Sequence, residues 1–330
     1  MKAQSKWRLV FGLLAAAALV PGIPAVAGGA PEPVVLRVAS PFKPGHILVD
    51  AAQKFSELIE ESSGGRIGVL LIAGSASEED VNIQCSQGVV DIQLTGGRPL
   101  EVFSPQYFFF NAPYIIKDYA HFLRVWDGPI GKKAKDLVLA NGNMLSLGTV
   151  FRGLRQTTSN KPLAGPADLK GLKLRLPVVQ TWIAVWKSLE TEPVPVPLPE
   201  LYQALKDGRA EASEGDLTQI VSFKLAEVQS KLSITNHLVG VGWVMINSGS
   251  YERLSGADKK RVTRAMQEAC LWATEKMKAS ESKLIEQLKS QGMTVTTPDA
   301  NAIRVKAKPA IEELFKTAWP VATWEEVLAQ

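Results

Sequence analysis

The sequence predicts an α/β fold in two lobes, and three observations carry this prediction. Strand-like apolar runs alternate with amphipathic helix patterns, first over residues 34–94 and again over residues 144–247. The chain has 330 residues, and a chain of this length is usually divided into two domains. A segment without Gly or Pro, Ala257–Ser290, could form one helix of roughly 50 Å, which exceeds a single small domain. Such a helix would lie across both lobes.

The first 27 residues have the pattern of a secretory signal peptide. A positively charged start precedes the short apolar run Leu9–Val20, and Ala25–Ala27 offers a small-residue cleavage site after Ala27. We therefore expect an exported protein, with an uncleaved anchor helix as the alternative. Cleavage would remove three basic and no acidic residues, so the formal net charge of +4 would fall to about +1. Nothing in this charge balance favours a nucleic acid as partner.

The first lobe is predicted as a β-α-β-α-β unit, an order that requires parallel strands joined by right-handed crossovers. Its elements are a strand at Val34–Ala39, a helix at His46–Ser63, a strand at Ile67–Ala73, a helix to about Gln87 with Ser75 and Glu78 at capping-box spacing, and a strand at Val89–Leu94. The turn Thr95–Pro99 then stands at the carboxyl end of the third strand, where ligands bind in open α/β sheets.

The second half repeats this order without repeating the sequence. We expect strands at Met144–Phe151, Lys173–Leu176, Ala210–Ser213, Leu232–Thr235 and Val239–Asn247, with helices at Thr181–Leu189 and from about Asp216. The predicted domain boundaries follow from these elements. Residues 34–151 with about 241–275 would form lobe I, and residues 152–240 with about 276–330 would form lobe II.

Motifs for catalysis, cofactors and metals are missing from the sequence. It contains no G-x-S-x-G elbow, no phosphate-binding glycine loop and no H-E-x-x-H, and its three histidines and two cysteines have no metal-ligand spacing. We therefore expect no enzyme activity, no cofactor and no metal. Cys85 and Cys270 both lie in helical patterns, and either a disulfide or two buried thiols would fit an exported chain.

Two arginines are the strongest candidates for a binding site. Arg175 stands between Leu174 and Leu176 in a predicted strand, so its side chain points to the face opposite the leucines. Arg155 lies twenty residues earlier. A guanidinium binds a carboxylate through two parallel charge-assisted hydrogen bonds, so the two arginines could hold the carboxylate of a small ligand. A surface salt bridge for each arginine is the alternative.

Four stretches carry a family resemblance over nearly the whole mature chain: VLRVASPFKPGH, TSNKPLAGPADLKGLKLRLP, PVPVPLPELYQALKDGRAEASEG and ITNHLVG. They resemble the substrate-binding subunits of tripartite ATP-independent periplasmic (TRAP) transporters, of the dicarboxylate-binding type. The resemblance implies a clamshell like that of periplasmic binding proteins, with crossover strands and one long helix spanning both lobes. It also implies that Arg175 forms the salt bridge to the ligand, and Arg155 resembles a second arginine that sialic acid binders use.

The same resemblance implies a function and further site residues. A periplasmic monomer would capture a small organic acid, such as a dicarboxylate, and deliver it to the small and large TRAP membrane subunits. A sensor module that presents ligand to a membrane receptor and an exported α/β enzyme are the alternatives. Gly215 stands where the family often has a polar contact, which would leave room for a bulkier ligand. The remaining candidates are Glu214 beside it, Phe42, Gly97 and Arg98 by their position, and Trp182 and Trp243, which would otherwise pack in the core.

Overall fold

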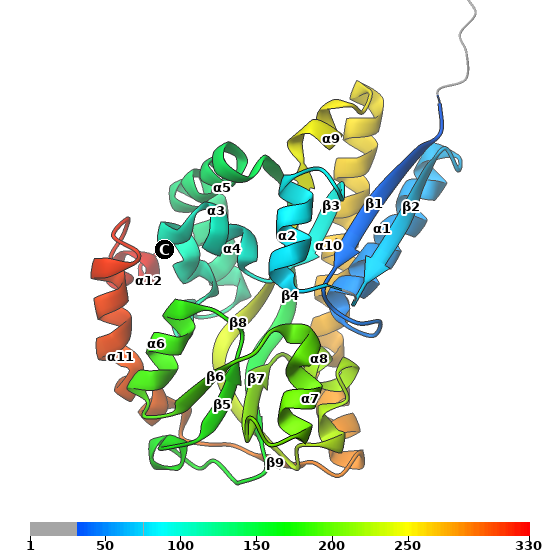
Figure 1. Cartoon of the computed structure of the whole chain (residues 1–330). Coiled ribbons are helices and arrows are strands. Elements are labelled where there is room, and N and C mark those ends of the chain that lie inside the picture. The colour runs from blue at the N-terminus through cyan, green and yellow to red at the C-terminus, as the bar shows by residue number, and fades with distance from the viewer. Residues whose placement is uncertain (1–31, 75) are drawn as a thin grey trace, which may run out of the picture. The chain divides into compact units, whose positions relative to one another are not determined.

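One nine-stranded mixed sheet forms the centre of the described chain (Figure 1). The computed structural model describes residues 32–74 and 76–330, so the predicted signal peptide and Ser75 lie outside the described residues. The strand order is β2-β1-β3-β8-β4-β7-β5-β6, with β9 beside β8. The strands are β1 (Val34–Ser40), β2 (Ile67–Ala73), β3 (Ile92–Thr95), β4 (Met144–Ser159), β5 (Lys173–Leu176), β6 (Glu192–Pro195), β7 (Ala212–Gly215), β8 (Lys231–Asn247) and β9 (Thr294–Thr296).

The first lobe is centred on β1, β2 and β3, and its predicted parallel pairing is confirmed. Helix α1 (Ile47–Ser63) connects β1 to β2 and ends at Gly64, whose φ of 63° suits a glycine C-cap. Helix α2 (Glu78–Ser86) leads to β3. Its N-cap is Ser77, whose Oγ accepts a hydrogen bond from Asp80 N at 3.0 Å. The capping box therefore begins two residues after the predicted Ser75.

Strands β4 and β8 are longer than the sequence indicated. We predicted a strand ending at Phe151 and two separate strands between residues 232 and 247, whereas each segment forms one continuous strand that serves both lobes. The two strands pair antiparallel, with register shifts at Ser146/Gly148, Phe151/Gly153 and Arg155/Thr157. These bulges bend the strands and interrupt the alternation of side chains. The polar residues after Phe151 concealed the continuation of β4.

The second lobe is centred on β5, β6 and β7, which pair in parallel. The proline-rich β6 lies at the edge of the sheet, where a residue without a backbone N–H is tolerated. Strand β7 joins this part to β4. Short helices cover the lobe: α6 (Gln180–Ser188), α7 (Leu201–Lys206) and α8 (Leu217–Ser222).

Helix α10 (Gly256–Ser290) confirms the predicted long helix, with 35 residues. It packs on α1 and β4 in one part and on α8 and β9 in another, so it spans both lobes (Figure 1). The chain then forms α11 (Ala300–Thr317) and α12 (Trp324–Leu328). The remaining elements are α3 (Arg98–Phe103), α4 (Tyr119–Asp127), α5 (Pro129–Gly142), α9 (Ser248–Glu252) and the 3₁₀ turns η1 (Pro105–Asn111), η2 (Pro166–Leu169), η3 (Leu198–Glu200) and η4 (Leu225–Glu227).

The C-terminal helix returns to α4. The His121 Nε2 lies 2.8 Å from Val327 O, and Arg124 Nε donates to Gln330 O at 2.8 Å. The predicted lobe boundaries place these groups in different lobes, and the boundaries stay a prediction.

Both cysteines are buried and free, so Cys85 and Cys270 do not pair. Over the described ranges, no helix is both long and apolar enough to cross a membrane.

Candidate ligand-binding site

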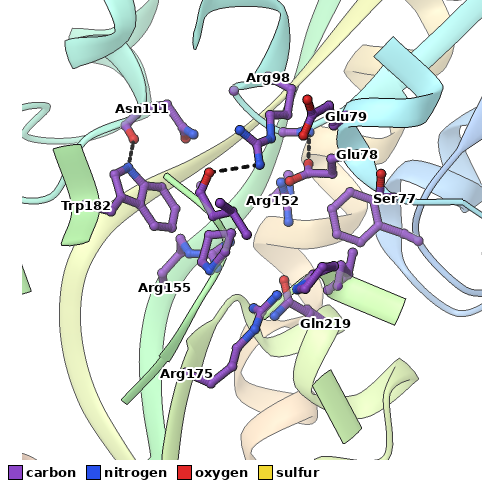
Figure 2. Close-up of a pocket in the computed structure, with 18 residues that line it drawn as sticks. Ser77, Glu78, Glu79, Arg98, Asn111, Arg152, Arg155, Arg175, Trp182 and Gln219 are labelled. Carbon is purple, nitrogen blue, oxygen red and sulfur yellow. Dashed lines mark hydrogen bonds between the residues drawn. The ribbon is translucent and has the colours of Figure 1, made fainter. Parts of the chain in front are cut away.

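A cavity lies where the carboxyl ends of β1, β3 and β5 meet the middle of β4 (Figure 2). Its volume is about 90 Å³, which gives room for several water molecules or a small organic ligand. Open α/β sheets bind ligands at such strand ends. Many segments contribute residues to the lining of the cavity. They include the loop after β1, the first turn of α2, the start of α3, the end of η1, the strands β4 and β5, and the helices α6 and α8.

Arg175 projects from β5 into this cavity and is only 1% exposed. Its Nε and Nη2 donate to the carbonyl oxygen of Val196, at 3.0 and 2.6 Å. Among the described residues it has no acidic partner within ion-pair distance. The pKa of Arg175 is lowered to about 10, chiefly by burial and also by the positive charge of Arg155, while the more distant charges of Glu214 and Glu78 act in the opposite direction. The site therefore contains a buried cation without a counterion.

Arg155 is also buried, but an internal carboxylate neutralises it. Its Nε donates to Glu214 Oε2 at 2.6 Å, and its Nη2 donates to Glu214 Oε1 at 2.8 Å. Burial alone would lower the pKa of Arg155, but Glu214 and Asp216 raise it above its ordinary value. For the acid Glu214 burial acts in the opposite direction and would raise the pKa, but Arg155 and His237 lower it to about 2. Both groups are charged at neutral pH, and Arg155 already holds a carboxylate.

A third arginine in the cavity was missed by the sequence analysis. Arg152 Nη2 donates to Asp216 Oδ2 at 2.7 Å, and its guanidinium lies 4.4 Å from the centre of the Phe42 ring. Residues three apart in a regular strand point to opposite faces, so Arg152 and Arg155 were not expected in one site. The register shift at Phe151/Gly153 breaks that alternation. The glycine at position 153 was the available sequence signal for a bulge, and in the structure its φ is 89°.

Six of the nine candidate residues line the cavity: Arg175, Arg155, Trp182, Phe42, Gly97 and Arg98. Trp243 does not. It is fully buried in β8, with its ring 5.6 Å from Phe122 and 6.0 Å from Trp126, so it belongs to the aromatic core of the first lobe.

Glu214 and Gly215 are also outside the cavity lining. Glu214 lies behind Arg155 as its partner. We expected Gly215 to leave room for ligand, but a Cβ at this position would come within 2.6 Å of Gln219 Nε2. The Gln219 side chain therefore fills that space, and Gln219 itself lines the cavity.

Hydrogen bonds join the opposite walls of the cavity. Trp182 Nε1 on α6 donates to Asn111 O at 2.6 Å, and Arg98 Nη2 donates to Val178 O at 3.1 Å (Figure 2). A Cβ on Gly97 would lie 2.2 Å from Asn111 Nδ2, so this glycine is required for the Asn111 side chain to fit. The structure thus shows the two lobes in contact around the cavity.

Two α/β lobes with a cavity at the ends of their strands define the class of two-lobed solute-binding proteins. A family model described as "Bacterial extracellular solute-binding protein, family 7" matches residues 38–318. The chain belongs to this family, which includes the TRAP solute-binding proteins that its motifs resemble. It is a solute-binding protein and not an enzyme.

Individual relatives bind different acids. The chain is 30% identical over 280 residues to the sialic acid-binding periplasmic protein SiaP of Vibrio cholerae, which covers 84% of this chain and 87% of that protein. It is 27% identical over 328 residues to the C4-dicarboxylate-binding periplasmic protein DctP of Rhodobacter capsulatus, covering 97% and 92% of the two chains. A solved TRAP periplasmic solute-binding protein from Roseobacter denitrificans with bound L-galactonate has a TM-score of 0.83 and 26% identity, covering 91% of this chain and 100% of that chain.

Proposed function

We propose that this protein captures a small organic acid through a salt bridge to Arg175 and delivers it to the membrane subunits of a TRAP transporter. One observation carries the proposal: Arg175 is a buried cation that faces a cavity without an acidic partner among the described residues. A ligand carboxylate would supply that partner. The sialic acid, C4-dicarboxylate and galactonate bound by the relatives all carry a carboxylate, which supports this choice.

The energy of such a contact is sufficient for useful affinity. A hydrogen bond to a charged group contributes roughly 1.5–3 kcal/mol, and each ~1.4 kcal/mol changes an affinity tenfold. Two such bonds to one carboxylate therefore correspond to about 100-fold or more. Lobe contacts such as Trp182–Asn111 exclude water, and a drier cavity strengthens the ion pair. A direct contact between Arg155 and the ligand stays a prediction, because the Nε and Nη2 of Arg155 already donate to the carboxylate of Glu214.

The cellular role follows from the N-terminal sequence and the family. A signal peptide cleaved after Ala27 would export the chain to the periplasm, where the named relatives SiaP and DctP are binding proteins. The loaded protein, acting as a monomer, would then dock on the small and large integral membrane subunits. Transport energy would come from those subunits, since this chain carries no nucleotide-binding motif.

The proposal is tested by finding the acid and then removing the cation. A thermal-shift screen of an organic-acid library identifies a ligand, since binding to the folded state raises the melting temperature. Calorimetric titration of Arg175→Met should then show at least about 100-fold weaker binding, with Arg175→Lys in between because a lysine binds a carboxylate less specifically. Arg209→Met is the matched control, because Arg209 is an exposed arginine outside the cavity. Unchanged titration of folded Arg175→Met would defeat the assignment.

A further inference from the structure

The cavity wall formed by α2 is acidic. Glu78 and Glu79, in the first turn of α2, both line the cavity. Glu78 is half-buried, and its Oε1 accepts a hydrogen bond from Gly96 N at 2.6 Å, which fixes the carboxylate. Neither glutamate forms an ion pair with a Lys or Arg among the residues that the structure describes. The charge of Glu78 acts at longer range on Arg155 and Arg175, where it raises the pKa, and it also acts on whatever occupies the cavity.

Most of the arginines that line the cavity form ion pairs with acidic residues of the same chain. Arg152 pairs with Asp216, Arg155 pairs with Glu214, and Arg98 pairs with Glu101. The two buried histidines near these pairs, His46 and His237, add no positive charge at neutral pH, because burial lowers the pKa of each. Among the described residues that line the cavity, Arg175 alone is a cation with no acidic partner. Arg175 can thus neutralise one carboxylate, whereas the wall that carries Glu78 and Glu79 is negative.

Building on the proposed function, we infer that the ligand is a monocarboxylate whose far end carries hydroxyl or ammonium donors and no second negative charge. One carboxylate neutralises Arg175, and a donor at the far end would be accepted by Glu78, since an ionised carboxylate only accepts hydrogen bonds. A second carboxylate would find no unpaired cation and would approach the negative charges of Glu78 and Glu79. Like charges a few ångströms apart in a poorly hydrated site disfavour binding strongly.

The relatives do not decide this point, because SiaP and DctP take different kinds of acid. The charge pattern of this chain favours a monocarboxylate over a dicarboxylate. It provides one attractive element, Arg175, and one repulsive element, Glu78, and such a combination gives selectivity between related ligands. A dicarboxylate of the kind that the sequence suggested is therefore disfavoured.

Size-matched acid pairs test the inference by calorimetry at pH 7.5. We would use D-gluconate against D-glucarate, L-threonate against L-tartrate, and glycerate against tartronate, since the members of each pair differ only in a terminal CH₂OH or carboxylate. The monocarboxylate should bind at least about tenfold more tightly in any pair that binds. Equal or tighter binding of the dicarboxylate overturns the inference, as does failure of all six acids.

Two variants connect the preference to named residues. Glu78→Gln keeps an oxygen acceptor for Gly96 N but removes the charge, so it should reduce the preference by about tenfold, mainly by strengthening dicarboxylate binding. Glu60→Gln on the exposed side of α1, outside the cavity, is the matched control and should leave the preference unchanged. An unchanged preference in Glu78→Gln overturns the role of Glu78.

Arg175→Met separates the two proposals. Dicarboxylate binding that is as tight as monocarboxylate binding, but is lost in Arg175→Met, would leave the proposed function intact and contradict only the inferred ligand class. Tight binding that survives Arg175→Met would contradict the proposed function itself.

Discussion

Arg155 and Arg175 line the same cavity and are almost equally buried, yet they differ in what neutralises them. Arg155 holds the carboxylate of Glu214 with two hydrogen bonds, whereas Arg175 donates only to the backbone oxygen of Val196. In a buried pair each charge offsets part of the desolvation cost of the other, whereas a buried charge without a partner has no such compensation. The comparison supports the proposal that Arg175 binds the ligand, whereas Arg155 has its partner within the fold.

The pKa values express the same difference. Burial moves the pKa of Arg175 from 12.5 to about 10, which corresponds to about 3 kcal/mol against the charged form. A ligand carboxylate would offset this cost. The pKa of Arg155 is instead raised, because Glu214 outweighs the effect of burial. A perturbed group in a cleft is a functional candidate, and here the direction of the perturbation separates two arginines that look alike in sequence.

The largest expected effect is on the stability of the ligand-free protein. Arg155→Met should lower the free energy of unfolding by ~3–5 kcal/mol, because it leaves Glu214 buried without its main partner. Arg175→Met should change it by less than ~1 kcal/mol or raise it, because no internal acid loses a partner. Denaturant unfolding followed by circular dichroism measures both values.

The matched control for that comparison removes the whole pair. Arg155→Met combined with Glu214→Met should recover most of the loss of the single variant, since replacing both members of a buried pair by apolar groups is often nearly neutral. Equal losses for Arg155→Met and Arg175→Met would show that the two arginines have the same structural role.

Acid should weaken the fold through Glu214. Its pKa is about 2 in the folded protein and 4.5 ordinarily, so the folded state binds this proton less readily than the unfolded state. The stabilisation is complete above pH 4.5 and is lost as the pH falls toward 2, by about 3 kcal/mol in all. The variant that lacks both Arg155 and Glu214 should lose less stability over this range, as measured by denaturant unfolding at each pH. Parallel curves for this variant and the wild type would contradict the pKa of Glu214.

The smallest effect concerns the contact between the lobes. Trp182→Phe removes the hydrogen bond to Asn111 O and should weaken ligand binding about fivefold, since a hydrogen bond contributes ~1 kcal/mol. Trp186→Phe on the same helix is the control. The Trp186 indole N–H has no hydrogen-bond partner among the described residues, so its loss should leave the affinity unchanged. Equal changes in the two variants would show that the Trp182–Asn111 bond does not support binding.

Much of the fold was predictable because its signals are local. The strand Ile67–Ala73 is a continuous apolar run, and α10 lacks Gly and Pro after its first residue, so both were predicted closely. The family resemblance implied crossover strands, but the residue pattern did not give their bounds, because the second half of β4 is polar and follows a bulge at Gly153. Arg175 and Arg155 were recognisable as candidates from the sequence, but the difference between them depends on Glu214, which lies 59 residues from Arg155. Contacts at that separation have no local signature.

The decisive measurement of the role of Arg175 is a calorimetric titration of one acid, chosen from the thermal-shift screen, into three proteins. These are the wild type, Arg175→Met, and the variant in which both Arg155 and Glu214 are replaced by Met. Arg175→Met should lose at least about 100-fold in affinity, while the double variant should stay within about tenfold of the wild type. Wild-type affinity in Arg175→Met, or an equally large loss in the double variant, would contradict this role of Arg175.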